Sequence, residues 1–317
     1  MRLGEFELIE RLLKELPLPS KEVVVPAGDD TAVVEIGKGK YQLLTTDALV
    51  EGSHFKLKWK EVLEDLFFLL GKKLVNVCAS DVASMGGIPK LALINLGTPK
   101  EIGEKCLIEI YRGIGKAAEE LKISVIGGDT VKSKTLFFDM ALIGESSGFM
   151  LRSCARPGDL VGVTGTFGDS RGGLELLSRG KISPKYLINR FLSPQARIRE
   201  GKEALKLGVK CGTDVSDGLL FNIWTISASS RVRIDVEREK IPISQELIDT
   251  FGREKALEFA LYGGEDYELV ITFPEKLTAK LEELGFKVIG EVKKGSGVFL
   301  DGKKVKVSGY DHFKEEK

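Results

Sequence analysis

The sequence predicts an α+β protein of two domains, and three observations support this fold class. The chain has 317 residues, which exceeds the usual size of one domain, roughly 100–200 residues. Patterns typical of strands and helices alternate in both halves without a strict βα repeat, which favours separate α and β layers over a doubly wound sheet. A polar, turn-rich segment at 152–159 lies between the halves. We therefore expect an N-terminal domain at 1–148 and a C-terminal domain at 149–317.

In the N-terminal half, apolar residues at helical spacing predict a short amphipathic helix at 6–16, which ends before Pro17. Further patterns predict strands at 32–34, 41–44, 91–96, 123–126 and 136–144, and helices at 61–84 and 101–121. The helix at 61–84 is expected to stop at Gly86 and Gly87, because Gly terminates helices and Pro89 prevents the helix from resuming.

In the C-terminal half, the same patterns predict strands at 160–163, 232–236, 269–273 and within 286–307, and helices at 186–207, 217–229, 256–260 and 275–284. Gly162, Gly165 and Gly168 imitate a dinucleotide-binding fingerprint. Their spacing is GxxGxxG instead of GxGxxG, and no acidic residue ends a following strand at the expected distance. We therefore do not expect a Rossmann-type nucleotide site.

Short acidic segments are the most informative feature of the sequence. The central one, 45–55, follows the strand at 41–44 and places hydroxyls, carboxylates and an imidazole where that strand is expected to end. The others are Gly28-Asp29-Asp30-Thr31, Ser80-Asp81, Gly127-Gly128-Asp129-Thr130, Asp214-Val215-Ser216-Asp217-Gly218 and Gly263-Gly264-Glu265-Asp266-Tyr267. Each alone is also typical of a turn or an Asx hydrogen bond, and Ser216 or Asp217 is also a candidate helix N-cap. Their recurrence favours a shared function.

Oxygen ligands of this kind suit Mg²⁺. A hairpin would bring 28–31 close to 45–47. Asp81 lies in the last turns of its helix, where the helix dipole disfavours a carboxylate, so we expect a cation beside it. The commonest reason to gather several Mg²⁺ ions is to hold a polyphosphate, and phosphoryl transfer depends mainly on positioning and charge neutralisation. The sequence has no Walker A segment and no protein-kinase motif set, so any nucleotide site must be of another type.

The composition narrows the class of partner. Lys plus Arg and Asp plus Glu each number 47, so no basic excess points to nucleic acid or to an anionic membrane, and small-molecule partners are expected. Four cysteines stand far apart without a zinc-site or disulfide pattern, which fits a reducing, cytoplasmic setting. No apolar run approaches the roughly 20 residues that a membrane span needs. The chain also has just two histidines, His54 and His312, so histidine-based catalysis has few candidates.

The acidic segments, together with Gly309-Tyr310-Asp311-His312-Phe313, resemble the thiamine-monophosphate kinase family nearly end to end and in order. The segments at 263–269 and 309–313 distinguish the chain from the related aminoimidazole-ribonucleotide synthetases. The chain also lacks the glycine-rich N-terminal Cys and Lys of selenophosphate synthetases and the cysteine tail of hydrogenase-maturation relatives. Cys78 is one departure, because relatives commonly carry Asn there.

The resemblance implies a two-domain aminoimidazole-ribonucleotide-synthetase-like fold whose N-terminal domains pair into a β-barrel across a homodimer. It implies ATP-dependent, Mg²⁺-assisted phosphorylation of thiamine monophosphate to thiamine diphosphate. The implied Mg²⁺ ligands are Asp30, Thr45, Thr46, Asp47, Asp81, Asp129, Asp214 and Asp217, among which Asp47, Asp81, Asp129 and Asp214 are the catalytic candidates. The implied ATP contacts are Tyr111, Gly128, Asp129, Arg152 and Ser216, and the implied acceptor contacts are His54, Glu265, Tyr310 and Phe313.

Alternatives remain for several of these residues and for the function. His54 is also a candidate for capping or packing, Arg152 for a salt bridge at the junction, Tyr111 for a core position and Glu265 for closing a turn. The alternative functions are another ATP-dependent activity of the same superfamily, such as aminoimidazole-ribonucleotide synthesis, and nucleotide sensing without turnover.

Overall fold

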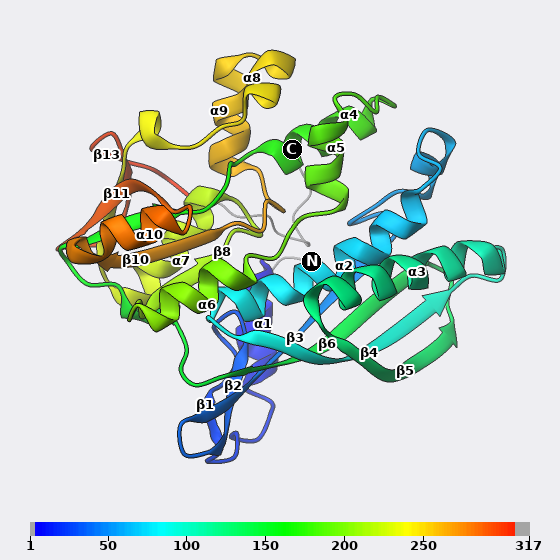
Figure 1. Ribbon diagram of the computed structural model, residues 1–317, viewed down its shortest axis with the longest axis horizontal. Helices are drawn as coiled ribbons and strands as arrows, with labels where there is room; N and C mark the ends of the chain where they lie inside the picture. Colours follow the sequence, from blue (N-terminus) through cyan, green and yellow to red (C-terminus); the bar gives the residue numbers. More distant parts are fainter. Residues whose placement is uncertain (1–3, 308–317) are drawn as a thin grey trace.

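The computed structural model describes residues 4–307, which build two mixed β-sheets with helices packed against them (Figure 1). The first sheet has six strands in the order β1-β2-β3-β6-β4-β5, and the second has seven in the order β13-β12-β9-β11-β7-β10-β8, both counted over the described residues. The α+β class predicted from the sequence is confirmed at this level.

In the N-terminal part, most neighbouring strands are antiparallel, whereas β4 and β5 are parallel and joined by α3. The helices α2 and α3 pack against each other, and α2 contacts β3, β4 and β6. The strands are β1 (Val23–Val25), β2 (Ala32–Gly37), β3 (Lys40–Val50), β4 (Ile88–Thr98), β5 (Ser124–Lys132) and β6 (Phe137–Ser146). The helices are α1 (Glu5–Leu13), the 3₁₀ helix η1 (Leu57–Glu61), α2 (Leu66–Ser84) and α3 (Glu104–Leu121).

In the C-terminal part, helices cover both faces of the sheet, because one apolar cluster includes α7 and another includes α6 and α10. The strands are β7 (Asp159–Val163), β8 (Cys211–Asp214), β9 (Arg233–Val236), β10 (Leu269–Pro274), β11 (Lys287–Lys293), β12 (Gly297–Leu300) and β13 (Lys303–Lys304). The α-helices are α4 (Asp169–Ser178), α5 (Lys185–Leu192), α6 (Ile198–Lys206), α7 (Leu219–Ser230), α8 (Gln245–Phe251), α9 (Arg253–Tyr262) and α10 (Thr278–Glu283). Short 3₁₀ turns are η2 (Arg152–Cys154), η3 (Arg238–Lys240) and η4 (Glu275–Leu277).

Two strands are longer than the sequence predicts, and this changes the setting of the site. The expected strand at 41–44 runs on to Val50, because β6 pairs with β3 along its whole length. The expected strand at 123–126 runs on to Lys132, because β4 pairs with it. The polar residues at 45–47 and 127–130 therefore lie inside strands, and their expected position at strand ends was wrong.

Helix boundaries differ for local reasons. The expected helix at 186–207 is two helices, α5 and α6, because Pro194 lies in the break between them. The expected helix at 61–84 begins at Leu66, after η1. The strand β1 and the seven-residue helix α8 were not expected from the sequence.

Across residues 4–307, no helix combines the length and the apolar character needed to cross a membrane.

Candidate active site at the junction of the two sheets

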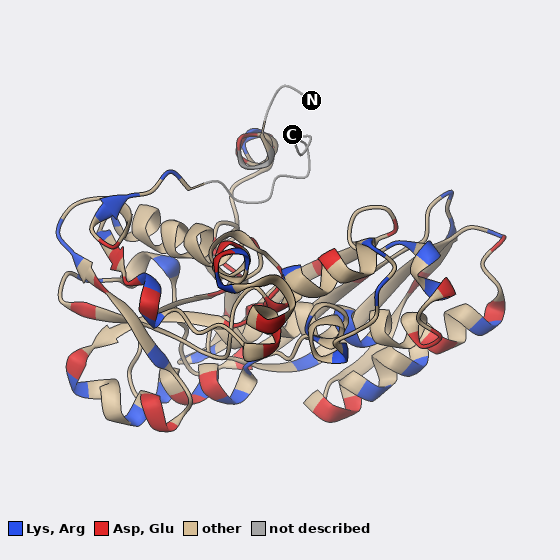
Figure 2. Cartoon of the chain, turned by 90° about the horizontal axis from the view of Figure 1, so that it is seen from above, with Lys and Arg blue, Asp and Glu red and all other residues tan. Residues whose placement is uncertain are grey.

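Three carboxylates from three separate elements meet at one point. Asp30 precedes β2, Asp81 lies near the end of α2, and Asp214 ends β8, and one oxygen from each lies within 4.8 Å of the others. Figure 2 shows Asp and Glu, in red, and Lys and Arg, in blue, interspersed along the chain. We refer to Asp30, Asp81 and Asp214 as the acidic triad.

Each carboxylate of the triad accepts a hydrogen bond from a hydroxyl group. Ser84 Oγ donates to Asp30 Oδ2 over 2.7 Å, Ser80 Oγ donates to Asp214 Oδ2 over 2.6 Å, and Thr45 Oγ1 donates to Asp81 Oδ2 over 2.5 Å. Ser80 and Ser84 are four residues apart on α2, so they share one face of the helix. These hydroxyls orient the triad. The other oxygen of Asp30, Oδ1, accepts from Arg152 and from Thr213 Oγ1.

Asp47 and Asp217 adjoin the acidic triad. A hydrogen bond links Asp47 to Asp81, and the charges of Asp47 and Asp217 act on each other. Alternation along β3 places Thr45 and Asp47 on the face covered by α2 and Thr46 on the opposite, exposed face. The N-cap alternative for Ser216 and Asp217 was wrong, because the N-cap of α7 is Gly218 and no side chain caps it.

Three carboxyl groups here, those of Asp47, Asp81 and Asp214, have pKa values above the ordinary value. Desolvation, followed by the charge of Asp30, raises the pKa of Asp214 to about 8. Protein atoms around the partly exposed Asp47 desolvate its carboxyl, and with the charge of Asp217 they raise its pKa to about 6. Burial and then the charges of Asp47, Asp214 and Asp30 raise the pKa of Asp81 well above its ordinary value. A bound cation would offset this repulsion.

Arg152 supplies a positive charge at the edge of the cluster. Its Nη2 donates to Asp30 Oδ1, its Nε donates to Thr213 Oγ1 over 3.2 Å, and its backbone N–H donates to Asp29 Oδ2 over 3.1 Å. Arg152 therefore makes the junction salt bridge of the alternative interpretation. It also lies beside the acidic triad, as the ATP-contact prediction requires.

The loop 263–267 packs directly against the loop 214–218. Glu265 N–H donates to Ser216 O over 2.6 Å, and Tyr267 N–H donates to Val215 O over 2.9 Å. A Cβ atom on Gly264 would lie 2.5 Å from Ser216 O, so only glycine permits this approach. Glu265 and Tyr267 both have left-handed backbone conformations, with φ of 65° and 52°. The structure thus brings Glu265 and Ser216 together beside the triad.

Two residues near the cluster were not predicted from the sequence. Tyr267 is buried, and burial followed by the charges of Glu265, Asp47, Asp214 and Asp217 raises the pKa of its hydroxyl well above the ordinary value. Lys73 on α2 is fully buried, and its Nζ lies 2.8 Å from Glu265 Oε1. The signal for Lys73 was present in the sequence, because a lysine stands in the apolar stripe of Leu70, Leu74 and Val77.

The other predicted site residues lie on segments that do not carry the triad, or outside the described chain. His54 Nδ1 accepts a hydrogen bond from Val50 N–H over 3.1 Å, as the capping alternative predicts. Tyr111 on α3 is 42% exposed, so the core alternative for it was wrong. Gly128 and Asp129 lie in β5, an exposed strand three positions from β3 in the sheet. Tyr310 and Phe313 lie outside the described residues 4–307.

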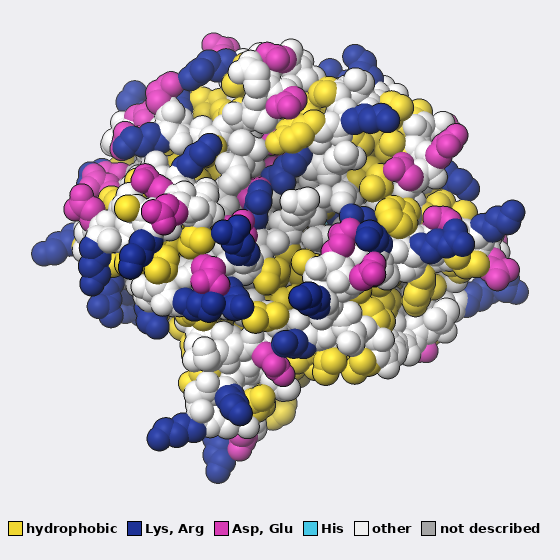
Figure 3. All heavy atoms as spheres, viewed as in Figure 1, with side chains coloured by type: hydrophobic (Ala, Val, Ile, Leu, Met, Phe, Trp, Pro, Cys, Tyr) yellow, Lys and Arg dark blue, Asp and Glu magenta, His cyan; other side chains and the backbone are white. Residues whose placement is uncertain are grey.

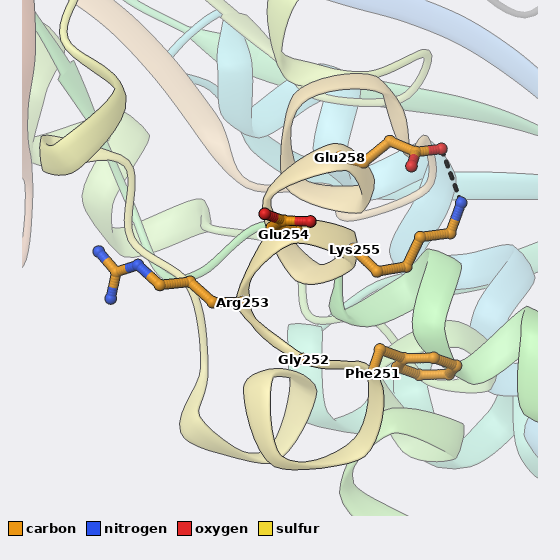
Figure 4. Close-up of a pocket in the computed structure, with 6 residues that line it drawn as sticks. All are labelled: Phe251, Gly252, Arg253, Glu254, Lys255 and Glu258. Atoms are coloured by element: carbon orange, nitrogen blue, oxygen red, sulfur yellow. Dashed lines mark hydrogen bonds and ion pairs between the residues drawn. The ribbon is translucent and has the colours of Figure 1, made fainter.

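A surface hollow of about 400 Å³ lies at α8 and α9 (Figure 4). Its lining residues are Phe251, Gly252, Arg253, Glu254, Lys255 and Glu258. Lys255 and Glu258 pair with each other over 2.7 Å and are exposed. None of the lining residues belongs to the acidic triad, so we do not assign the active site to this hollow.

Comparison with known proteins agrees with this geometry. Family models of the AIR synthase related proteins match the chain, with the N-terminal domain over residues 28–146 and the C-terminal domain over 156–303. A curated thiamine-monophosphate kinase of Aquifex aeolicus is 40% identical over an alignment of 318 positions, which covers 98% of each chain. The chain belongs to the thiamine-monophosphate kinase family. The kinase of Bacillus subtilis is 33% identical, with 98% of this chain and 100% of the relative covered.

Solved structures show the same relationship. A structure described as AaThiL complexed with AMPPCP and TMP is 40% identical, covers 99% of both chains and has a TM-score of 0.88. The thiamine-monophosphate kinase of Stenotrophomonas maltophilia K279a is 31% identical, with 96% of this chain and 99% of that one covered and a TM-score of 0.78. The HypE–HypF complex shares the fold alone. It is 18% identical, with a TM-score of 0.72 and with 98% of this chain and 99% of that one covered. The family resemblance predicted from the acidic segments is confirmed.

Proposed function

We propose that this protein transfers the γ-phosphoryl group of ATP to thiamine monophosphate and so forms thiamine diphosphate. The observation that carries the proposal is the acidic triad with its hydroxyl partners, in a chain 40% identical to a thiamine-monophosphate kinase along 98% of its length. A relative of the same identity has been solved with the ATP analogue AMPPCP and TMP. The two alternative functions have no comparable support.

We propose that the residues of the cluster bind Mg²⁺, as several ions. Mg²⁺ takes oxygen ligands, and the carboxylates of Asp30, Asp81 and Asp214 converge within 4.8 Å with desolvated, mutually repelling charges. We propose these three together with Asp47, Asp217, Thr45 and Asp129 as the ligand set, and Thr46 as a ligand through its backbone carbonyl oxygen, because its side chain lies on the opposite face of β3. Bound Mg²⁺ would neutralise phosphate charge and align the reacting groups.

The protein residues in this mechanism position the reactants. The acceptor is a phosphomonoester whose second pKa is about 6. Its attacking oxygen is therefore already anionic near neutral pH and needs no general base. We propose direct transfer without a phosphoenzyme. Arg152, Ser216, Tyr111, Gly128 and Asp129 are proposed to face ATP, and His54, Glu265, Tyr310 and Phe313 to face the acceptor.

We also propose a homodimer in which the N-terminal sheets of two copies close a barrel. Support comes from the exposed apolar side chains on β4 and β5. They are Leu91, Leu93, Val125, Ile126 and Val131. Figure 3 shows hydrophobic side chains over this part of the surface. An exposed edge strand with an apolar face is a favourable site for pairing with another chain.

We propose domains at 1–148 and 149–317, in a cytoplasmic protein.

An acceptor panel tests the proposed function. The purified protein is incubated with ATP and Mg²⁺ and with thiamine monophosphate, thiamine, or the precursor of aminoimidazole ribonucleotide, and ADP and products are measured. We expect ADP and thiamine diphosphate in equal amounts with thiamine monophosphate alone. ATP consumption that does not depend on thiamine monophosphate, or ATP binding without turnover under all conditions, would refute the proposal in favour of one of the two alternatives.

A further inference from the structure

Lys73 on α2 is fully buried, although the packing of this helix does not require a charged residue at that position. Its Nζ lies 3.8 Å above the centre of the Phe191 ring and 2.8 Å from Glu265 Oε1. Its helical neighbours Leu70 and Leu74 are also fully buried. Removing an ammonium group from water costs several kcal/mol unless it is paired. An apolar residue here would fill the same space without that cost, so the charge itself must have a use.

The ammonium of Lys73 is incompletely satisfied. Its ion pair with Glu265 Oε1 is the one polar contact that the described chain gives it, and no other oxygen there accepts from its N–H groups. The ring of Phe191 lies against the same ammonium and adds a cation–π interaction. The two partners differ in exposure, because the Lys73 side chain is 0% exposed and that of Glu265 is 24% exposed. Lys73 thus contacts the inner side of a carboxylate whose outer side faces solvent.

Glu265 needs such a partner because of its surroundings. Its left-handed backbone and its hydrogen bond to Ser216 O place it against the loop that carries Asp214 and Asp217. Glu265 therefore shares this part of the site with the carboxylates of Asp214 and Asp217. Like charges repel one another, so these carboxylates disfavour a position of the Glu265 side chain close to them. The buried cation holds it in place.

We propose that Lys73 is a positioning residue for acceptor binding, holding Glu265 through Oε1 so that Oε2 is presented to a cationic or N–H-bearing part of the acceptor. The inference rests on the proposed function, in which Glu265 faces thiamine monophosphate, a molecule with a cationic thiazolium ring and an aminopyrimidine. Lys73 itself touches no substrate. Its loss should therefore weaken acceptor binding and leave ATP binding unchanged.

The test is a double-mutant cycle of Lys73→Met and Glu265→Gln, with Lys72→Met as the matched control. Lys72 is the adjacent lysine, and it pairs with Glu120 over 3.3 Å, away from Glu265. We expect Lys73→Met to raise the KM for thiamine monophosphate about tenfold and to change the KM for ATP by less than about twofold. The double variant should bind the acceptor no worse than Glu265→Gln alone, because both changes remove one shared contact. Lys72→Met should behave as the wild type.

Two results would overturn the inference. One is that the KM effects of the two substitutions multiply in the double variant, and the other is that Lys73→Met raises the KM for both substrates equally. If Lys73→Met alone does not fold, the comparison is between Glu265→Gln and the double variant, because the double variant buries no unpaired charge. A higher KM for the acceptor in the double variant would then count against the inference. A wild type that does not phosphorylate thiamine monophosphate refutes the proposed function instead, and melting temperatures of the four proteins then test the Lys73–Glu265 contact by itself.

Discussion

At the scale of single residues, the site is built from carboxyl groups that repel one another. Asp47, Asp81 and Asp214 are all held in conditions that raise their pKa values, chiefly through desolvation. Such an arrangement costs folding free energy and is retained where a ligand needs it. Asp47 illustrates the difference between the needs of folding and of function.

We predict that Asp47→Asn lowers kcat by about 100-fold or more, because a proposed Mg²⁺ ligand loses its charge while keeping its shape. The fold should be unaffected or slightly more stable, because the substitution removes one of the repelling charges. Turnover and thermal melting measured on the same preparation check this. The control is Asp235→Asn, because Asp235 lies in β9 and forms an ion pair with Arg233. Near-normal turnover of Asp47→Asn in saturating Mg²⁺ would remove Asp47 from the site.

Glu268 is a buried carboxylate of the opposite kind, because it is fully paired. Arg197 donates to it through Nε and Nη2, both over 2.6 Å, and Arg190 Nη2 and Thr164 Oγ1 donate over 2.8 and 2.6 Å. Burial opposes ionisation, but the hydrogen bonds and charges of Arg197, with the charge of Arg190, hold the pKa of Glu268 below its usual value of 4.5. The ionised carboxylate therefore stabilises the fold at neutral pH.

We predict that Glu268→Gln destabilises the protein by about 3–5 kcal/mol, because it leaves two partly buried arginines without their fully buried carboxylate. Chemical denaturation at neutral pH measures this. Since the folded pKa is depressed, the contribution is complete above the unfolded pKa and is lost as the pH falls through the folded pKa. The wild type should therefore lose stability from about pH 5 to about pH 3, and the variant should show a smaller loss. Glu203→Gln, at an exposed pair with Lys206, is the control, and equal stability of the two variants would contradict the prediction.

Residue types were easier to predict than their partners. The aspartates of the triad could be predicted because short polar segments interrupt apolar ones. Lys73, Tyr267 and Glu268 were missed because their roles depend on partners far away in the sequence, such as Lys73 with Glu265 and Glu268 with Arg190. No local pattern specifies such pairs.

At the scale of elements, close contact between backbones constrains the strands that carry the site. Gly128 in β5 is an example, because a Cβ atom there would lie 1.7 Å from Ile94 O in β4. The glycine predicted to contact ATP therefore also has a structural role in pairing the two strands.

We predict that Gly128→Ala lowers the free energy of unfolding by about 1–3 kcal/mol, because the added methyl group forces β5 away from β4. Denaturation curves measured without nucleotide test this, since any effect on ATP binding is then absent. Gly37→Ala in β2, where a Cβ atom meets nothing within 4 Å, is the control. Unchanged stability of Gly128→Ala with weaker ATP binding would mean that the glycine serves the nucleotide alone.

Element types were predicted better than element ends. The helix α2 could be predicted from the sequence, because its long apolar stripe is typical of a helix packed on a sheet. The true length of β3 could not be read from 45–47, because these polar residues continue a strand only when β6 pairs beside them. The α5–α6 break was signalled by Pro194 and was overlooked.

At the scale of the whole molecule, Asp129 is a proposed ligand on a strand, β5, that carries none of the triad. Three strand spacings separate β5 from β3, or about 14 Å in a flat sheet. Because β5 lies at the exposed edge of the sheet, where a second copy is proposed to pair, we expect Asp129 to complete the site of the partner.

We predict that equal amounts of Asp47→Asn and Asp129→Asn, each inactive alone, regain about one quarter of wild-type activity when they are mixed and allowed to exchange subunits. Half of the dimers would be mixed, and one of the two sites in each mixed dimer would be intact. Light scattering before and after mixing measures the oligomeric state. A compact monomer at micromolar concentration would remove the homodimer, and a dimer without recovered activity would place Asp129 in the site of its own chain.

The two-domain α+β class could be predicted from alternating patterns, but the meeting of three aspartates at one point could not. That convergence depends on how the two sheets are placed, and contacts between Asp30, Asp81 and Asp214 span most of the chain. The family resemblance supplied what local patterns lacked.

The most direct test of the account is to follow the γ-phosphoryl group itself. The enzyme is mixed with γ-labelled ATP and thiamine monophosphate, with Mg²⁺ or with a chelator, and the label is traced in a single turnover. The account predicts one label in the terminal phosphate of thiamine diphosphate for each thiamine monophosphate consumed, with Mg²⁺ alone and with no label retained on the protein. Label released as inorganic phosphate regardless of the acceptor, or transfer at the same rate in the chelator, would contradict it.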